Sequence, residues 1–375
     1  MNDCYVELLK NQFCSNWIDC EANTYTDARR QSFHNSLKGL YEELKGWTIP
    51  AGADDSLKQD FTILFEVFSR WSEVISMNTD KMPHREILIC LERILYDWLG
   101  SEADKYLLTL SDGEYLYRLP ICKLDVLNNI TEGFWHVHFD TFPIELALPK
   151  YFSEDMFFNV VLFHELGHFV ESYYDIDDKV FRQLEPLLKD LVNNQTIVNQ
   201  SFPFLAGKDA IDVADEKKVR SHICEYIADL FGAQYVSNHI MNYASYKLDK
   251  TLDKDDEEHP CWNKRNEHVT LFLTSSVDNL LINAIKDVIA KINKEGLIIR
   301  FCVLDSKYFL EGKPHPISND AEMVSVYKHI WDMYIQGCAP FIAVSDADDW
   351  RKSNFGIHRK LTELAKVSIN LYRPV

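Results

Sequence analysis

Residues 156–171 read MFFNVVLFHELGHFVE, a segment that is apolar on most faces of a helix and therefore predicts a buried helix. Within it, His164, Glu165 and His168 form the pattern HExxH, which places two imidazoles one turn apart on one face. Zinc prefers nitrogen and carboxylate ligands, and a catalytic zinc site needs three protein ligands. The segment thus predicts two ligands, His164 and His168, with Glu165 as the general base.

A second buried helix, over about residues 217–236, offers the missing ligand. Glu225 and Asp229 lie one turn apart on a face otherwise rich in Ile, Leu and Phe. Buried carboxylates are costly unless they have a partner, and a metal site supplies one. We expect Glu225 to be the third ligand and Asp229 to accept a hydrogen bond from a ligand histidine. The alternative is an ordinary pair of buried helices whose histidines hydrogen-bond to core carbonyls.

The two motifs together, HExxH and the later ExxAD, resemble those of the gluzincin zinc metallopeptidases. The resemblance is greatest to the soluble minigluzincin-like and M48-like bacterial proteins and to the ImmA/IrrE type. It implies one zinc ion per chain, held by His164, His168 and Glu225. It also implies Glu165 as the catalytic base and Asp229 as the residue that orients a ligand.

Two weaker features agree with the resemblance, which spans residues 144 to about 266. The segment Ile144-Glu-Leu-Ala-Leu-Pro149 resembles the edge strand that pairs with extended substrate in such peptidases; ordinary sheet structure is the alternative. His259-Pro260, followed by Arg265, resembles a His-Pro segment that precedes an arginine in several of these families. This implies that His259 can donate a hydrogen bond to the developing oxyanion; a solvated loop after the acidic run 253–258 is the alternative. The long insertion between the two motif helices departs from the smallest gluzincins.

The composition excludes several classes of function. The chain has 375 residues and a net charge of −19, with no cluster of Lys and Arg, so we expect no nucleic-acid or membrane partner. The nine cysteines are scattered, contain no CxxC pair and are expected to be reduced. No apolar run approaches the length of a membrane span, and the first residues, MNDCYVELLK, do not have the pattern of an export signal. These features favour a cytoplasmic location.

The predicted architecture is a mainly helical α+β fold with a zincin-like core and a small, partly antiparallel sheet over the motif helix. Residues 1–105 are expected to be an N-terminal helical region, and residues 106–375 the metallopeptidase core with a C-terminal helical extension. Apolar periodicity predicts further helices over 32–45, 57–75, 85–99, 180–192, 266–294, 321–335 and 358–371, and strands over 114–119, 135–140 and 144–148.

The sequence therefore predicts an intracellular zinc endopeptidase that acts on a protein or peptide substrate. We expect selectivity for one or few proteins, with the N-terminal helices covering the cleft or binding a regulatory partner. Two alternatives stay open at this point. One is a non-catalytic protein in which the same zinc cluster stabilises a regulatory or binding module, and the other is a metal-free helical interaction protein.

Overall fold

The structure is a computed structural model that describes residues 3–78, 85–112, 117–118, 124–149, 155–242, 255–275, 278–293, 295–345 and 348–372. The chain forms two compact units, one of residues 1–88 with 99–150 and the other of residues 89–98 with 151–375. Helix α4 (Arg85–Leu99), which coincides with its predicted range, contributes residues to both units. The expected boundary at residue 105 lies inside the first of them.

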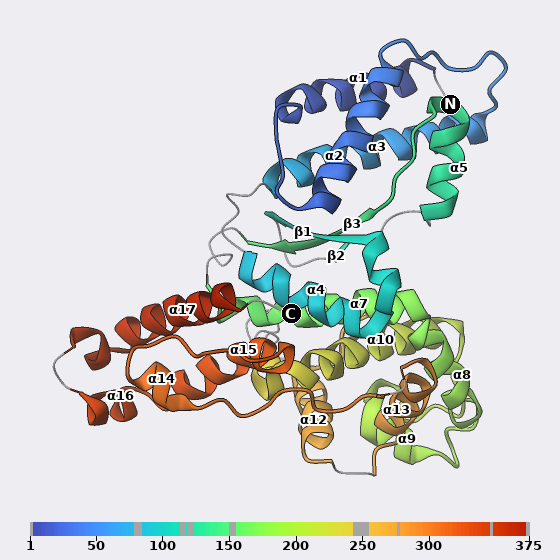
Figure 1. Cartoon of the computed structure of the whole chain (residues 1–375). Helices are drawn as coiled ribbons and strands as arrows, with labels where there is room; N and C mark the ends of the chain where they lie inside the picture. The colour runs from blue at the N-terminus through green and yellow to red at the C-terminus, as the bar shows by residue number, and fades with distance from the viewer. Residues whose placement is uncertain are drawn as a thin grey trace. The chain divides into compact units, whose positions relative to one another are not determined.

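The first unit combines a helical layer with a mixed sheet (Figure 1). The strands lie in the order β1-β3-β2, with β1 parallel and β2 antiparallel to β3. Aromatic side chains fill the core between helices and sheet, among them Trp17, Phe68, Trp135 and Phe139. The elements are α1 (Asp3–Cys20), α2 (Ala28–Leu44), α3 (Asp55–Met77), β1 (Tyr106–Asp112), β2 (Tyr117–Arg118), α5 (Leu124–Trp135) and β3 (Phe142–Leu148).

The edge strand predicted at residues 144–149 is wrong, because β3 is the central strand of this sheet. It pairs with β1 along its whole length and with β2 at Glu145 and Leu146. All seven residues of β3 are buried, as expected of a nearly continuous apolar run between two neighbours. Its one charged side chain, Glu145, is paired with Arg70 at 3.0 Å. The strand therefore has no free edge for an extended substrate along the part that β2 covers.

Two further predictions of local structure are wrong. Residues 135–140 form no strand, because Trp135 ends α5 and His136 adopts a left-handed backbone with φ 56°. The single helix predicted over 266–294 is two helices, α12 (Trp262–Leu273) and α13 (Leu280–Ile292). Ser275 is left-handed with φ 54°, and the Asn279 side chain caps α13 by accepting from Ile282 N at 2.9 Å. Ser275 and Asn279 thus interrupt the helix although the apolar periodicity continues in α12 and α13, because polar side chains compete for backbone hydrogen bonds.

The second unit is helical and contains both motif segments. Helix α10 begins with a capping box in which the Asp212 side chain accepts from Asp215 N at 2.9 Å and the Asp215 side chain accepts from Asp212 N at 3.1 Å. The main elements are α7 (Val161–Tyr174), α8 (Ile176–Leu188), α9 (Gln195–Ser201), α10 (Val213–Val236), α12, α13, α14 (Ser306–Leu310), α15 (Asp320–Ile335), α16 (Ala339–Val344) and α17 (Asn354–Leu371). None of the helices in the described part of the chain is both long enough and apolar enough to cross a membrane.

The sheet belongs to the first unit and the motif helices α7 and α10 belong to the second. The mainly helical α+β character of the chain is as predicted. A zincin-like core, which would need the sheet beside α7, stays a prediction.

Helices α7 and α10 pack side by side at a glycine (Figure 1). A Cβ atom placed on Gly167 would lie 2.9 Å from Ala228 Cα and 3.0 Å from Phe231 Cβ, closer than real contacts allow. The absence of a side chain at Gly167 therefore permits the close approach of the two helices that carry the HExxH and ExxAD motifs.

We expect Gly167→Ala to lower the free energy of unfolding by about 1–3 kcal/mol, because the added methyl group forces α7 and α10 apart. Urea unfolding followed by circular dichroism measures this change. The matched control is Gly133→Ala in α5, where nothing lies within 4 Å of the added Cβ. The control should be neutral or more stable by up to about 1 kcal/mol. Equal stability of the two variants would contradict the packing argument.

Candidate metal centre

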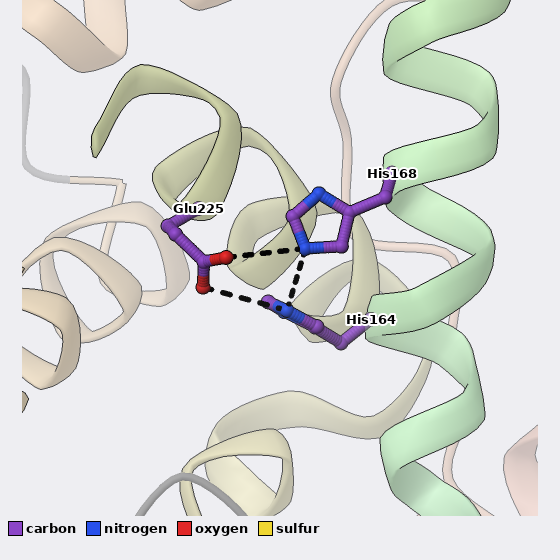
Figure 2. A group of neighbouring side chains, drawn as sticks. All are labelled: His164, His168 and Glu225. Carbon is purple, nitrogen blue, oxygen red and sulfur yellow. Dashed lines mark hydrogen bonds and ion pairs between the residues drawn. The ribbon is translucent and has the colours of Figure 1, made fainter. Parts of the chain in front are cut away.

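Three side chains from the two motif helices converge on one point (Figure 2). The Nε2 atoms of His164 and His168 lie 3.0 Å apart. Glu225 faces both, with Oε2 3.6 Å from His164 Nε2 and Oε1 3.3 Å from His168 Nε2. One potential ligand atom from each residue lies within 4.8 Å of the others, so the group can hold a metal ion. Two imidazole nitrogens and a carboxylate are a donor set that suits zinc and related transition metals.

The helices explain why these residues meet. His164 and His168 are four residues apart on α7 and so lie on the same face. Gly167, beside His168, allows the backbone of α10 to come close at Ala228. Ala228 lies between Glu225 and Asp229 in the sequence, so the two carboxylates come from the part of α10 that faces Gly167.

Asp229 supports one of the histidines. Its Oδ1 atom lies 3.0 Å from His164 Nδ1, and the carboxylate is almost fully buried. A carboxylate at Nδ1 fixes the tautomer that leaves Nε2 free to bind a metal. The structure thus brings Asp229 to the position that the spacing predicted for it.

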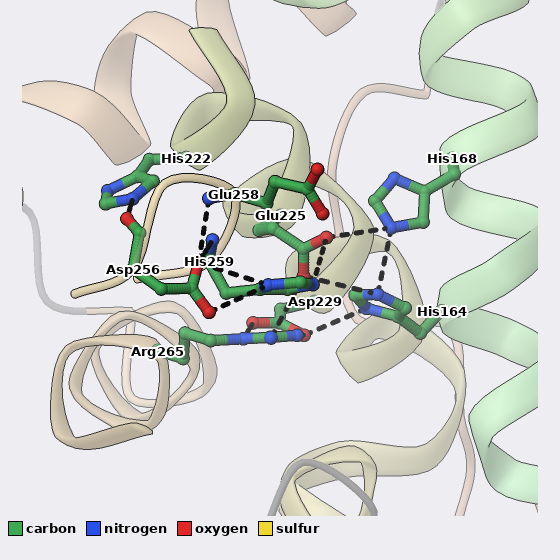
Figure 3. A network of polar contacts seen from close by, with 9 residues as sticks. All are labelled: His164, His168, His222, Glu225, Asp229, Asp256, Glu258, His259 and Arg265. Carbon is green, nitrogen blue, oxygen red and sulfur yellow. Dashed lines mark hydrogen bonds and ion pairs between the residues drawn. The ribbon is translucent and has the colours of Figure 1, made fainter. Parts of the chain in front are cut away.

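The sequence predicted a metal ion and a ligand histidine as partners of these two carboxylates but no basic side chain, and the structure adds Arg265 from α12 (Figure 3). Arg265 is 3% exposed. Its Nε and Nη2 atoms donate to the Asp229 carboxylate at 2.6 and 2.7 Å, and Nη1 lies 2.9 Å from Glu225 Oε2. The sequence signal for Arg265 was its place after His259-Pro260 in a segment that resembles one found in several of these families, with no role assigned to the arginine. This guanidinium holds both acidic side chains in place and balances their charge.

The charges around the centre favour ionised carboxylates. Burial alone raises the pKa of a carboxyl group, but Arg265 and the adjacent histidines keep the pKa of Glu225 well below its usual value. Arg265 and His164 likewise lower the pKa of Asp229 against the effect of burial. Both side chains are therefore anionic at neutral pH, as ligand and supporting group.

His168 is subject to opposing effects. Burial lowers its pKa, but the hydrogen bond and charge of Glu225, followed by the charges of Glu165 and Glu171, outweigh burial and raise the pKa above its usual value. A metal ion competes with a proton for this imidazole, so the raised pKa makes metal binding weaker as the pH falls.

Glu165 follows His164 on α7 and is 6% exposed. Among the residues that the structure describes, no Lys, Arg or His forms an ion pair with its carboxylate. Glu225, in contrast, is tied to Arg265 and the histidines. Glu165 is thus a buried carboxylate, adjacent to His164, that no positive group among the described residues engages.

The structure places His259 beside the centre, with Nε2 3.7 Å from Glu225 Oε1 (Figure 3). Its Nδ1 atom lies 3.3 Å from both oxygens of Asp256. The main-chain carbonyl oxygen of Asp256 in turn lies 3.1 Å from His222 Nε2. Residues 256–258 of the acidic run are exposed, as expected of a loop, while residues 253 and 254 lie outside the described part.

Three other histidines contact residues outside the group of His164, His168 and Glu225. His222 contacts Asp256, and His239 lies 2.8 Å from Asp332. His138 belongs to the first unit, where its partners are Glu132 and Asp140.

Comparison with known proteins gives no match: no family model, no curated protein and no solved structure is similar to this chain. The functional interpretation therefore depends on the residues and their geometry.

Replacing Arg265 by Leu should lower the free energy of unfolding by about 3–5 kcal/mol, because two buried carboxylates lose their positive partner. The control is Arg182→Leu on α8, where the arginine is 73% exposed and pairs with Asp178. Loss of that surface pair should cost at most about 1 kcal/mol. Urea unfolding of both variants tests this, and a similar small effect in both would show that Arg265 does not stabilise the centre.

Proposed function

We propose that this protein is a zinc-dependent endopeptidase of the gluzincin type that hydrolyses peptide bonds in a selective protein substrate. The observation that carries the proposal is the convergence of His164, His168 and Glu225 from two helices. Beside His164 lies Glu165, whose carboxylate pairs with no basic side chain among the described residues. A purely structural zinc site usually has four protein ligands and no use for an adjacent base.

His164, His168 and Glu225 would hold the zinc ion, with Asp229 and Arg265 fixing His164 and Glu225. When bound, zinc supplies Lewis-acid polarisation of a carbonyl group and lowers the pKa of water. The Glu165 carboxylate would accept a proton from the attacking water and later deliver it to the leaving amine. Within the described part of the chain, no ion pair of Glu165 competes with that role.

His259 would stabilise the negative charge of the reaction intermediate. As negative charge develops on the scissile carbonyl oxygen, the imidazole can donate a hydrogen bond to it. The Asp256 carboxylate accepts from His259 Nδ1–H, so donation from Nε2, the nitrogen nearest Glu225, uses the doubly protonated imidazolium. The proposal thus assigns an acceptor role to Glu165 and a donor role to His259.

A non-catalytic role is the second candidate, and one observation favours it. The Arg265–Asp229–His164 contacts connect α12, α10 and α7 through buried polar groups. A metal at this point would tie together three helices of the second unit, as a structural site does. In that case Glu165 would have no catalytic role.

The variant Glu165→Gln separates the two functions. If the protein is a peptidase, we expect cleavage to fall at least about 100-fold while the zinc content is unchanged, since Gln cannot accept the proton. A proteome-derived peptide library, read by mass spectrometry, measures cleavage without knowledge of the substrate. The control is Glu185→Gln on α8, an exposed glutamate paired with Lys189. Unchanged cleavage in Glu165→Gln, or none in the wild type loaded with zinc, would favour the structural role.

We further expect Glu225→Ala to hold about one zinc ion fewer per chain than the wild type, because a two-histidine site binds weakly. Inductively coupled plasma mass spectrometry of protein purified without chelator gives the stoichiometry. Glu216→Ala, on the exposed face of the same helix, is the control and should retain all zinc. The same zinc content in both variants would show that Glu225 is not a ligand.

A further inference from the structure

A second group of potential ligands lies on the same part of the fold. Glu171 is in the last turn of α7, Asp177 is in the first turn of α8 and Cys224 is on α10. A carboxylate oxygen of each acid and the cysteine Sγ all lie within 4.8 Å of one another. The function proposed above uses none of these three residues.

The corner between α7 and α8 creates the group. Asp175 adopts a left-handed conformation with φ 50° and ψ 48°, so that α7 ends and α8 begins at this one residue. The turn brings Asp177 back against α7, where its main-chain N–H donates to Glu171 Oε1 at 3.2 Å. Cys224 precedes the ligand Glu225, and a helix rotates about 100° per residue, so its side chain leaves α10 in another direction.

The charge balance of this group differs from that of the first centre. Glu171 is only 4% exposed. Within the described residues, no Lys, Arg or His forms an ion pair with Glu171 or Asp177, whereas Arg265 forms ion pairs with Glu225 and Asp229. Burial, followed by the nearby Asp177, raises the pKa of Glu171 to about 8. In the part of the chain that the structure describes, no basic side chain balances this acidic group.

We infer that Glu171, Asp177 and Cys224 form a second metal site, which takes a thiophilic divalent transition metal such as zinc. The ligand set determines this class: a cysteine sulfur selects zinc or cobalt over the oxygen-seeking magnesium and calcium. A coordinating metal binds cysteine as the thiolate, so the occupied site would have three anionic ligands.

Such a metal would link the end of α7 to α8 and α10. Glu171 lies three residues after the ligand His168, and Cys224 lies one residue before the ligand Glu225. The second ion would thus fix the relative position of the helices that carry the first centre. The inference does not depend on peptide hydrolysis.

Cobalt(II) is the probe that distinguishes the two centres, because thiolate-to-cobalt charge transfer absorbs in the near ultraviolet and His and Glu ligands give no such band. We expect the metal-free full-length protein to develop this band on titration with cobalt chloride. Cys224→Ser should lose the band and about one equivalent of bound cobalt. Asp177→Asn should lower the affinity for this cobalt ion at least roughly tenfold. Glu225→Ala should keep the band while losing the other equivalent.

Cys302→Ser is the matched control, since Cys302 is another partly buried free cysteine of the second unit and lies 3.4 Å from Ser325 Oγ. It should retain the band. The absence of a thiolate band at saturating cobalt, or a band that persists in Cys224→Ser, would overturn the second site. Because the band and the Glu225-dependent equivalent are read separately, failure of one centre is distinguishable from failure of the other.

Discussion

The buried ion pairs of Arg265 are the interaction on which the candidate metal centre depends. One guanidinium contacts Asp229 through two hydrogen bonds and Glu225 through a third nitrogen, at a place where all three side chains are almost inaccessible to water. Two carboxylates one turn apart would repel each other and lose their hydration if they were buried alone. With Arg265 present, Glu225 stays anionic and can face the histidines, while Asp229 holds the tautomer of His164.

The second requirement is steric. Helices α7 and α10 carry the candidate ligands, and they approach closely enough because Gly167 has no side chain opposite Ala228. The same two helices also carry Glu171 and Cys224. The two acidic clusters differ in charge balance: Arg265 pairs with Glu225 and Asp229, whereas no basic side chain in the described part of the chain pairs with Glu171 or Asp177.

Local helix patterns were predictable where apolar residues recur without interruption. The predicted helix 85–99 coincides with α4, and α10 includes the whole of the predicted 217–236. The order of the strands in the sheet was harder to predict. Residues 142–148 are an apolar run, and such a run does not say whether a strand has one neighbour or two. The pairing with β1 and β2 involves residues distant in the chain, so the pattern within the strand carried no information on its central place.

The sequence by itself determined the pairs that a helix sets at four residues: His164 with His168, and Glu225 with Asp229. Helical periodicity fixes their common faces whatever the rest of the chain does. Only the tertiary structure decided which groups meet across helices. The contact of Arg265 with Asp229 spans 36 residues, and the group of Glu171, Asp177 and Cys224 spans three helices. Those contacts depend on how the helices pack and on a single left-handed residue, Asp175, neither of which the residue spacing reveals.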